Sequence, residues 1–401
     1  MQQNTGVDRR LHIVTRREFV RGLCMGSLAC AGIVAGGGVS CMFCSCSGMN
    51  GKHAKLHDVK DMLDRDVMVP ENIRSVFCSN PIGTVDLYIL APQYLAGWNF
   101  RPSGDNKKYI SDEYMALPSL GVWMGAGATP NDEEIVKQDP DVILCYWTAD
   151  DVGGEMADEV QDETGVCTLA VDYDVRSAPE MLRYVSSLLN VCDRGESLAQ
   201  FCEERIGRIR GIVAAIPAAE RKSIYLAQGE GGLSTDPVGS MHVTDALDLI
   251  GVSNVADLPG TEGKGMGMPT ISLEQIIAWN PDAVLASEYS MSDAESSDLY
   301  DDILGDANWQ NVKCVKNGDV YRIPQSPFSW FGRPPSIMRI LGCLWLLKIL
   351  YPAYTTDVDL VQETRDTYTL FYNRELSDAE LRNILTPAGI DVDTGMAQRA
   401  R

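Results

Sequence analysis

The sequence predicts an α/β protein with two lobes, each built on a mainly parallel sheet, joined by a long helix. From about Ile73 onward, short β-branched runs alternate with amphipathic helical patterns, which is typical of α/β layers. The alternation stops between Ser177 and Ile216, where apolar residues recur at helical spacing, and begins again with the strand-like run SIYLAQ at Ser223. One helix-to-strand unit also occurs in both halves of the chain.

This repeated unit indicates a duplicated lobe. Its first copy, DEEIVKQDPDVIL, begins at Asp132, and its second copy, LEQIIAWNPDAVL, begins at Leu273. Each copy places a Glu seven residues and an Ile five residues before a Pro-Asp pair, which is followed by an apolar run. Proline disfavours helical geometry in the residue before it, so the pair ends a short helix and starts a buried strand. One copy alone is a common junction, but two copies at matching places favour duplication.

The elements of the first half follow in order. Residues 72–175 are expected to form the N-terminal lobe, with IRSVFC as a strand and NDEEIVKQD as a helix capped by Asn131. DVILCYW and VCTLAVDY are predicted to be buried strands of the same sheet. Residues 176–217 then form the linking helix region.

The C-terminal lobe is expected to span residues 218–352. It contains the helix HVTDALDLIG, the strand AVLASEY and the run WQNVKCVKNGDVYRIP, in which Asn317-Gly318 predicts a tight hairpin turn. The helix SIMRILGCLWLLKILYP ends at Pro352. The tail, residues 353–401, is predicted to be helical, and LSDAELRNIL carries a capping box formed by Ser377 and Glu380.

The first 46 residues are typical of an export signal. TRREFVR is followed by the weakly hydrophobic run GLCMGSLACAGIVAGGGVS. Together these two segments resemble a twin-arginine export signal, in which Arg16 and Arg17 are the paired arginines. The apolar run is short and rich in glycine, so we expect a signal or an N-terminal anchor and not a stable membrane span. Cys41 is the candidate lipidated cysteine, since no second Cys/His pair follows VSCMFCSC at the spacing of a zinc site.

Composition and charge limit the possible partners. The chain has 401 residues, of which 45% are hydrophobic and 22% charged, as in globular proteins. Its formal charge of −22 would repel phosphate backbones, so nucleic acid is not expected as a partner. Seven cysteines follow the N-terminal segment. Most of them are expected to be small buried hydrophobes, although export would permit a disulfide, for example between Cys145 and Cys167.

Several longer runs identify a family. LAGWN, YMALPSLGVWMGAGATPNDE, YLAQGEGGLSTDPVGSMHVTDALDLIGVSNVAD and WFGRPPS, with both repeated units, resemble the substrate-binding proteins of ABC importers for iron-siderophore, haem and corrinoid ligands. The finer match is to the branch that contains molybdate- and tungstate-binding members. The resemblance implies two Rossmann-like lobes with a ligand cleft between them, a monomer without a cofactor or resident metal, and an ABC permease with its ATPase as partner. It also implies that Glu133 and Glu274, one in each repeated unit, contact that permease.

Candidate ligand-binding residues follow from where open α/β sheets bind ligands, which is outside the carboxyl ends of their strands. In the N-terminal lobe they are Tyr94, Trp98, Asn99, the glycine turn ending at Gly127, Tyr146, Trp147 and Tyr173. In the C-terminal lobe they are Gly231 and Ser234 within 229–234, Ser240, His242, the run 287–289, Trp330 and Arg333.

These residue types suit an oxyanion, because hydroxyl, indole, imidazole and glycine-loop N–H groups are hydrogen-bond donors. Arg333 is the candidate cation, although an arginine of this kind can also form an ion pair at the cleft rim. The aromatic residues suit a planar macrocycle or siderophore as well, and each could belong to the core instead. His242 is the only histidine within a lobe, which argues against a zinc or manganese site with several histidine ligands.

Two other classes of function remain open. A chelatase or metallocluster enzyme could use a similar bilobal scaffold, since fold alone does not decide function. Binding is favoured because the chain contains no G-x-x-x-x-G-K-[ST], G-x-S-x-G or H-E-x-x-H motif. A surface-anchored adhesin with a vestigial cleft is the third possibility, and it would show no stabilisation by a ligand.

Overall fold

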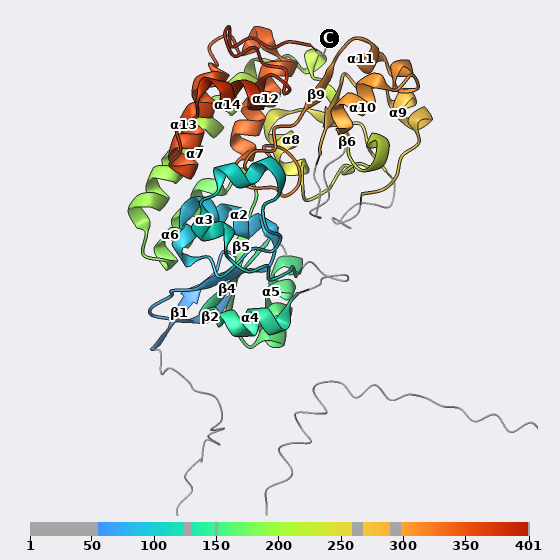
Figure 1. The fold of residues 1–401 in the computed structure, drawn as a ribbon. Coiled ribbons are helices and arrows are strands. Elements are labelled where there is room, and N and C mark those ends of the chain that lie inside the picture. The colour runs from blue at the N-terminus through green and yellow to red at the C-terminus, as the bar shows by residue number, and fades with distance from the viewer. Residues whose placement is uncertain (1–54, 124–129, 149–150, 259–267, 289–297, 400–401) are drawn as a thin grey trace, which may run out of the picture. The chain divides into compact units, whose positions relative to one another are not determined.

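A computed structural model describes residues 55–123, 130–148, 151–258, 268–288 and 298–399. Two separate parallel sheets organise this part of the chain (Figure 1). The first has the strand order β3-β4-β5, and the second has the order β7-β6-β8-β9, with every neighbouring pair parallel. We refer to the first sheet with its helices as the N-terminal lobe and to the second as the C-terminal lobe. The predicted α/β fold with parallel sheets is therefore confirmed.

The N-terminal lobe contains short, fully buried strands between helices. Its strands are β3 (Val76–Cys78), β4 (Val142–Trp147) and β5 (Thr168–Asp172), and its helices are α2 (Pro81–Leu90), α3 (Asp112–Met115), α4 (Asp132–Gln138) and α5 (Asp151–Thr164). An antiparallel hairpin, β1 (Leu56–Lys60) with β2 (Asp66–Pro70), precedes them. The hairpin turn is hydrogen-bonded to β5 through the backbone of Met62 and Ala170. Buried strands are continuous apolar runs because both faces of a parallel sheet are covered.

The C-terminal lobe repeats this alternation. Its strands are β6 (Ser223–Ala227), β7 (Ser253–Asn254), β8 (Ala283–Ala286) and β9 (Val320–Arg322), and its helices are α8 (Thr244–Ile250), α9 (Leu273–Trp279), α10 (Leu299–Gly305) and α11 (Lys313–Lys316). The predicted hairpin turn at Asn317-Gly318 is wrong. The preceding residues form α11, Gly318 takes a left-handed φ of 78°, and β9 pairs with β8 in parallel, which a tight hairpin cannot produce.

The two copies of the repeated unit fold alike. Helices α4 and α9 are capped by Asn131 and Ser272, and both end on a left-handed residue before the proline, Asp139 at φ 46° and Asn280 at φ 48°. The aspartate of each Pro-Asp pair then caps the start of the neighbouring strand. Asp141 accepts from the backbone of Arg74 and Ser75, and Asp282 accepts from the backbone of Ser223. The spacing that both copies share thus sets where the helix ends and how the following strand pairs with its neighbour.

Linker and tail helices join the lobes. The linker consists of α6 (Ala178–Leu188) and α7 (Cys192–Ala215). The last helix of the C-terminal lobe is α12 (Arg339–Leu350), and the tail contains α13 (Leu360–Tyr372) and α14 (Asp378–Leu385). The capping box of Ser377 and Glu380 is present at the start of α14. The remaining short 3₁₀ turns are Pro92–Tyr94, Gly104–Tyr109, Ala218–Glu220, Glu230–Gly232, Trp309–Asn311 and Pro352–Tyr354.

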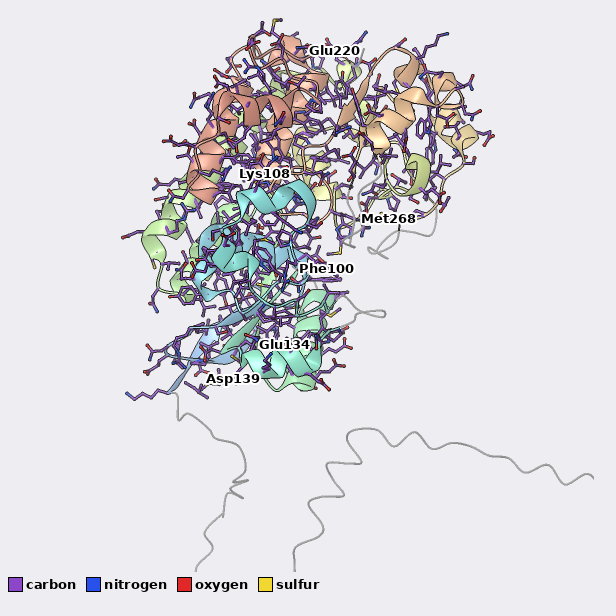
Figure 2. The ribbon with its side chains drawn as sticks, in the orientation of Figure 1. Phe100, Lys108, Glu134, Asp139, Glu220 and Met268 are labelled. Atoms are coloured by element: carbon purple, nitrogen blue, oxygen red, sulfur yellow. The ribbon has the colours of Figure 1, made fainter. Side chains whose placement is uncertain are left out.

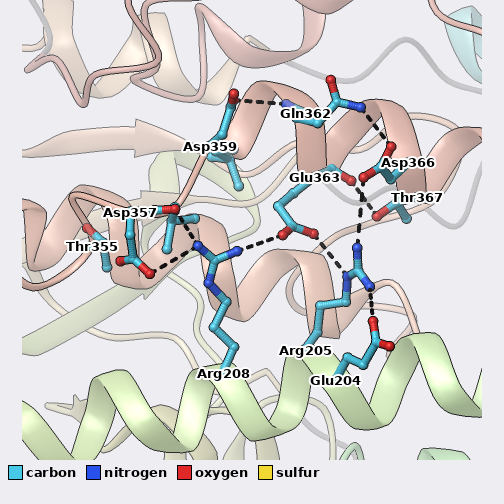
Figure 3. Close-up of polar contacts among 12 residues, drawn as sticks. Glu204, Arg205, Arg208, Thr355, Asp357, Asp359, Gln362, Glu363, Asp366 and Thr367 are labelled. Carbon is cyan, nitrogen blue, oxygen red and sulfur yellow. Dashed lines mark hydrogen bonds and ion pairs between the residues drawn. The ribbon is translucent and has the colours of Figure 1, made fainter.

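A charged cluster binds the tail to the linker (Figure 3). Arg205 and Arg208 of α7 donate to the two carboxylate oxygens of Glu363 on α13, over 3.0 and 2.9 Å. Glu363 is only 9% exposed. A carboxylate at this depth requires partners for both oxygens, and the two arginines supply them, so this contact fixes α13 against α7.

Some predictions lie outside the described residues. The export signal with Arg16 and Arg17, the candidate lipidation site Cys41, and Gly127 belong to segments that the structure does not describe. Residues 54–401, with the lobes, linker and tail, cluster as one compact unit. Within the described residues, no helix has the length and apolar character that crossing a membrane requires. All seven cysteines of this part are free.

Candidate ligand-binding cleft

A cavity of about 640 Å³ lies between the two lobes. Its N-terminal wall includes Thr84 of α2, Asn99 and Phe100, and its C-terminal wall includes Glu288 and Arg333. Phe100 is labelled in Figure 2 on the side of the N-terminal lobe next to the C-terminal lobe. The walls follow β3, β8 and β9, so the cavity opens at the carboxyl ends of strands of both sheets, where ligands of α/β proteins bind. Its volume falls in the range of roughly 300–1,000 Å³ found for small-molecule sites.

Arg333 lies on the C-terminal wall of this cavity and is held there by Asp236. Its Nε donates to Oδ2 of Asp236 over 3.0 Å, and its Nη2 donates to Oδ1 over 2.7 Å. The Asp236 carboxylate is fully buried, and the Arg333 side chain is 11% exposed. The arginine thus forms a buried bidentate pair, not the rim ion pair considered from the sequence. No described residue accepts from its Nη1.

Asp236 is saturated with donors. Its Oδ1 also accepts from the hydroxyl of Ser240, over 2.7 Å. Burial alone would raise the pKa of Asp236, but the hydrogen bonds and charges around it, chiefly those of Arg333, hold the pKa below its ordinary value. The Ser240 hydroxyl therefore supports the carboxylate, a role that its position in the sequence did not reveal.

His242 packs beside this pair without a hydrogen bond to either ring nitrogen from any described residue. The side chain is 2% exposed. Burial, followed by the positive charge of Arg333, lowers its pKa to about 3. The ring is therefore neutral at physiological pH and offers one N–H donor and one acceptor.

Gln228 and Ser287 are two further buried polar residues without partners. They directly follow β6 and β8, and each is 2% exposed. Neither amide atom of Gln228 nor the hydroxyl of Ser287 has a hydrogen-bond partner among the described residues. Ser287 lies within the candidate run 287–289, whereas Gln228 was missed. Its place directly after a buried strand is the signal that could have identified it.

The predicted aromatic residues of the N-terminal lobe are mostly packed into the interior. Trp98 is 1% exposed, donates from Nε1 to the carbonyl of Tyr114 over 2.8 Å, and lies 6.1 Å from the ring of Phe328. Tyr146 is buried beneath α2, where a Cβ on Gly83 would lie 2.3 Å from its ring. Phe328 comes from the loop after β9, so Trp98 serves a contact between the two lobes although it also borders the cavity.

Other predicted residues of the N-terminal lobe also have structural partners. The Tyr94 hydroxyl donates to the carbonyl of Leu189 over 2.8 Å, at the linker and not at the cavity. Asn99 borders the cavity, but its amide donates to the carbonyls of Cys78 and Gly121. Trp147 packs in a small apolar cluster with Cys145, Met156, Ala157 and Ala170.

The remaining predicted residues of the C-terminal lobe have mixed surroundings. The carbonyl of Gly231 accepts from Nε1 of Trp309 over 3.1 Å. Ser234 pairs through its backbone with Gln228. Trp330 is fully buried, and the hydroxyl of Tyr368 from α13 lies close to this loop through a hydrogen bond to the carbonyl of Ser326. None of these three lines the cavity directly.

Tyr173 helps to tie the lobes together. Its hydroxyl donates to the carbonyl of Met241 over 2.8 Å, and its own carbonyl accepts from Nη2 of Arg339 over 2.9 Å. Arg339 is 1% exposed and forms an ion pair with Asp245 of α8. The end of β5 is thereby bonded to the C-terminal lobe beside His242. Tyr173 is thus an interlobe contact.

Glu133 and Glu274 lie in the first turns of α4 and α9, and both side chains are exposed. Carboxylates are favourable there because of the helix dipole. Neither residue lines the cavity. In the described residues, no group of three or more His, Cys, Asp or Glu side chains is placed to hold a metal ion.

Comparison with known proteins identifies the family. The sequence profile of the periplasmic binding protein family matches residues 106–327. The chain belongs to the periplasmic binding protein family. Members of this family bind a small-molecule solute outside the cytoplasm, which agrees with a cleft that is lined from both lobes.

Individual proteins of the same kind are similar over most of the chain. A solved ABC transporter solute-binding protein from Sulfurospirillum deleyianum is 28% identical and covers 82% of this chain and 99% of its own, with a TM-score of 0.72. The molybdate-binding protein MolA of Haemophilus influenzae is 24% identical over 339 residues, which are 78% of this chain and 90% of that protein. The siderophore-binding protein FeuA of Bacillus subtilis, solved with ferri-bacillibactin, shares the fold at 15% identity, covering 75% of this chain and 98% of its own, with a TM-score of 0.51. These similar proteins are binding proteins.

Proposed function

We propose that this protein captures molybdate or tungstate in the cleft between its lobes and delivers it to an ABC permease. The observation that carries the proposal is the guanidinium of Arg333, fixed by Asp236 on the wall of a cavity that both lobes line. In a chain of charge −22, a held arginine provides local positive potential and directed N–H groups for an anion. Support also comes from MolA, a relative that is named for binding molybdate.

A thermal unfolding experiment tests this assignment. A ligand that binds only the folded state stabilises it by about 2.7 kcal/mol when its concentration is 100 times the Kd. We expect molybdate and tungstate to raise the melting temperature of the purified protein. If neither oxyanion raises it while haem, a corrinoid or a ferric siderophore does, the oxyanion assignment is wrong.

A ferric siderophore or a similar metal chelate is the second candidate ligand. The observation in its favour is the cavity volume of about 640 Å³, which is far larger than a tetrahedral oxyanion. Phe100 and Phe328 on the cavity wall could contact an aromatic chelate. Under this alternative Arg333 would bind the negative charge of the chelate, so the same arginine variant would weaken either ligand.

Docking and export complete the proposal. The exposed Glu133 and Glu274, each at the start of a matching helix, are proposed to contact the permease and to orient the encounter by charge. The protein is proposed to work as a monomer, exported by the signal that contains Arg16 and Arg17 and anchored through a lipid on Cys41. We also propose that the two lobes move as units relative to each other. The units are residues 72–175 and 218–352, and the linker between them is 176–217.

A further inference from the structure

Unpartnered polar groups gather at one edge of the C-terminal sheet. Strands β6 and β8 are neighbours, with Ala227 opposite Ala286, and the backbone N–H of Ser287 donates to the carbonyl of Ala227 over 2.9 Å. Gln228 and Ser287, the next residue on each strand, therefore lie side by side. Both are 2% exposed, and both amide atoms of Gln228 and the hydroxyl of Ser287 lack partners among the described residues.

His242 and Arg333 adjoin this pair. A Cβ placed on Gly332 would lie 3.8 Å from the Ser287 hydroxyl, so the backbone that carries Arg333 approaches Ser287 closely. His242 lies near the Arg333–Asp236 pair, because its backbone N–H donates over 3.3 Å to the Ser240 hydroxyl that is bonded to Asp236. Neither of its ring nitrogens has a partner among the described residues. Each buried polar group without a hydrogen bond costs about 1–3 kcal/mol. Gln228 and Ser287 at the sheet edge, together with His242 in the turn before α8, indicate a missing partner, because buried polar groups in folded proteins are nearly always hydrogen-bonded.

The chemistry of these side chains limits what that partner can be. The Gln228 amide, the neutral His242 ring and the Ser287 hydroxyl can all donate, and none carries a charge. The carboxylate of Asp236 already accepts from Arg333 on both oxygens and from Ser240 on one. A second carboxylate, that of Glu288 next to Ser287, forms an ion pair with Arg322 over 3.3 Å.

We propose that Gln228, His242 and Ser287 form an inner anion subsite beside Arg333, which holds the oxygen atoms of a fully deprotonated tetrahedral oxyanion. This inference rests on the proposed oxyanion function and assigns that function to particular donors. Molybdate and tungstate carry no proton at neutral pH and offer only acceptors, so every donor of the subsite can be used.

Calorimetric titration of the purified full chain with sodium molybdate tests the subsite. The variants Gln228→Met, His242→Phe and Ser287→Ala each remove donors while keeping the approximate size of the side chain. We expect each to lower the affinity for molybdate at least tenfold. Their unfolding midpoints without ligand should stay unchanged or rise, because replacing an unpartnered buried polar group by an apolar one removes its desolvation penalty. Ser186→Ala is the matched control, a buried serine on α6 whose hydroxyl already donates to the carbonyl of Arg183.

The outcomes separate the subsite from the function. If molybdate binds the natural protein and all three variants equally, the subsite is wrong and the proposed function stands. If molybdate does not bind the natural protein at all, both the proposed function and the subsite are wrong. A loss of affinity in Ser186→Ala as large as in the three variants would attribute their losses to weakened folding and overturn the subsite.

Discussion

The two lobes present different edges at and beside the cleft. Trp98, Asn99 and Arg333 line its cavity, whereas Gln228, His242 and Ser287 are buried beside it and do not line it. At the N-terminal edge, Trp98 and Asn99 donate to backbone carbonyls of their own lobe, and Trp98 also packs on Phe328. At the C-terminal edge, Gln228, His242 and Ser287 are equally buried but have no partners in the described part of the chain. Both lobes share the duplicated helix-to-strand unit, so the difference arises in the residues after the strands.

This difference indicates where hydrogen-bonding capacity is left for a ligand. At the N-terminal edge, Trp98 and Asn99 already hold loops and the contact between the lobes, and the Ser79 hydroxyl directly after β3 has no partner among the described residues. At the C-terminal edge, Gln228 and Ser287 follow neighbouring strands and are unsatisfied, and Arg333 is fixed by Asp236. Donors fixed in this way are what a preorganised site requires. We therefore assign the oxyanion to the C-terminal lobe and the closing wall to the N-terminal lobe.

The largest effect is expected from breaking the Arg333–Asp236 pair at the C-terminal edge. Arg333→Met leaves a fully buried carboxylate without its cation, which should lower the free energy of unfolding by about 3–5 kcal/mol. Urea unfolding monitored by circular dichroism measures the change. The double variant Asp236→Leu/Arg333→Met removes both charges and should recover most of that stability, while molybdate binding stays lost. A single variant as stable as the natural protein would contradict the pairing.

A smaller effect on stability is expected from Asp86, a buried carboxylate of the N-terminal lobe. Asp86 on α2 is 2% exposed and accepts from the backbone N–H of Ile337 over 2.9 Å. Burial raises its pKa to about 7, although that hydrogen bond and the charge of Arg339 oppose the rise. The carboxyl group of Asp86 thus binds its proton more tightly in the folded state than in the unfolded state.

The stability from protonated Asp86 is therefore fully present below the ordinary aspartate pKa and is lost as the pH rises through about 7. Asp86→Asn should be more stable than the natural protein at pH 8 by about 2–4 kcal/mol, from about 1.4 kcal/mol per pKa unit. The advantage should shrink as the pH approaches 4. Urea unfolding across this range measures it, and a constant difference at all pH values would contradict the raised pKa.

A third variant tests the N-terminal edge directly. Trp98→Phe loses the hydrogen bond to the Tyr114 carbonyl and part of the contact with Phe328, so we expect unfolding to become easier by about 1–2 kcal/mol. The affinity for molybdate should change less than twofold, because Trp98 acts in the contact between the lobes. A tenfold loss of affinity, measured by calorimetry at a temperature where the variant is folded, would move the oxyanion toward the N-terminal edge.

The smallest effect on the isolated protein is expected at Glu133 and Glu274. Both are exposed and lie outside the cavity, so Glu133→Lys/Glu274→Lys should leave stability within about 0.5 kcal/mol and affinity unchanged. Uptake of molybdate by cells that carry the permease should nevertheless be lost. The neighbouring exposed Gln275→Lys is a matched control that should retain uptake. Loss of affinity in the double variant would place these glutamates in the cleft.

Much of the fold could be predicted from local rules. The repeated unit was visible because a helix cap, a proline and an aspartate each act on neighbouring residues, and the caps at Asn131 and Ser377 are present. The hairpin predicted at Asn317-Gly318 failed because the same glycine also suits the end of a helix, and only the pairing of β9 decides between the two.

The candidate site was harder to predict, because a sequence shows residue types and not their partners. Tyr146 and Tyr94 follow the pattern of cleft residues, yet one lies under α2 and the other bonds to the linker. Arg333 was named, but its pairing with Asp236 joins residues that are 97 positions apart in the chain. Gln228 is an ordinary glutamine in the sequence, and only its burial without a partner gives it meaning.

The most direct test of the account is a crystal structure of the protein grown with tungstate, in which the anomalous signal of tungsten locates the anion. The account predicts one strong tungsten peak at the C-terminal edge of the cleft, with its oxygen atoms within hydrogen-bonding distance of Arg333, Gln228, His242 and Ser287. A peak that contacts only the N-terminal wall around Trp98 and Asn99, or a cleft without tungsten at saturating tungstate, would contradict it.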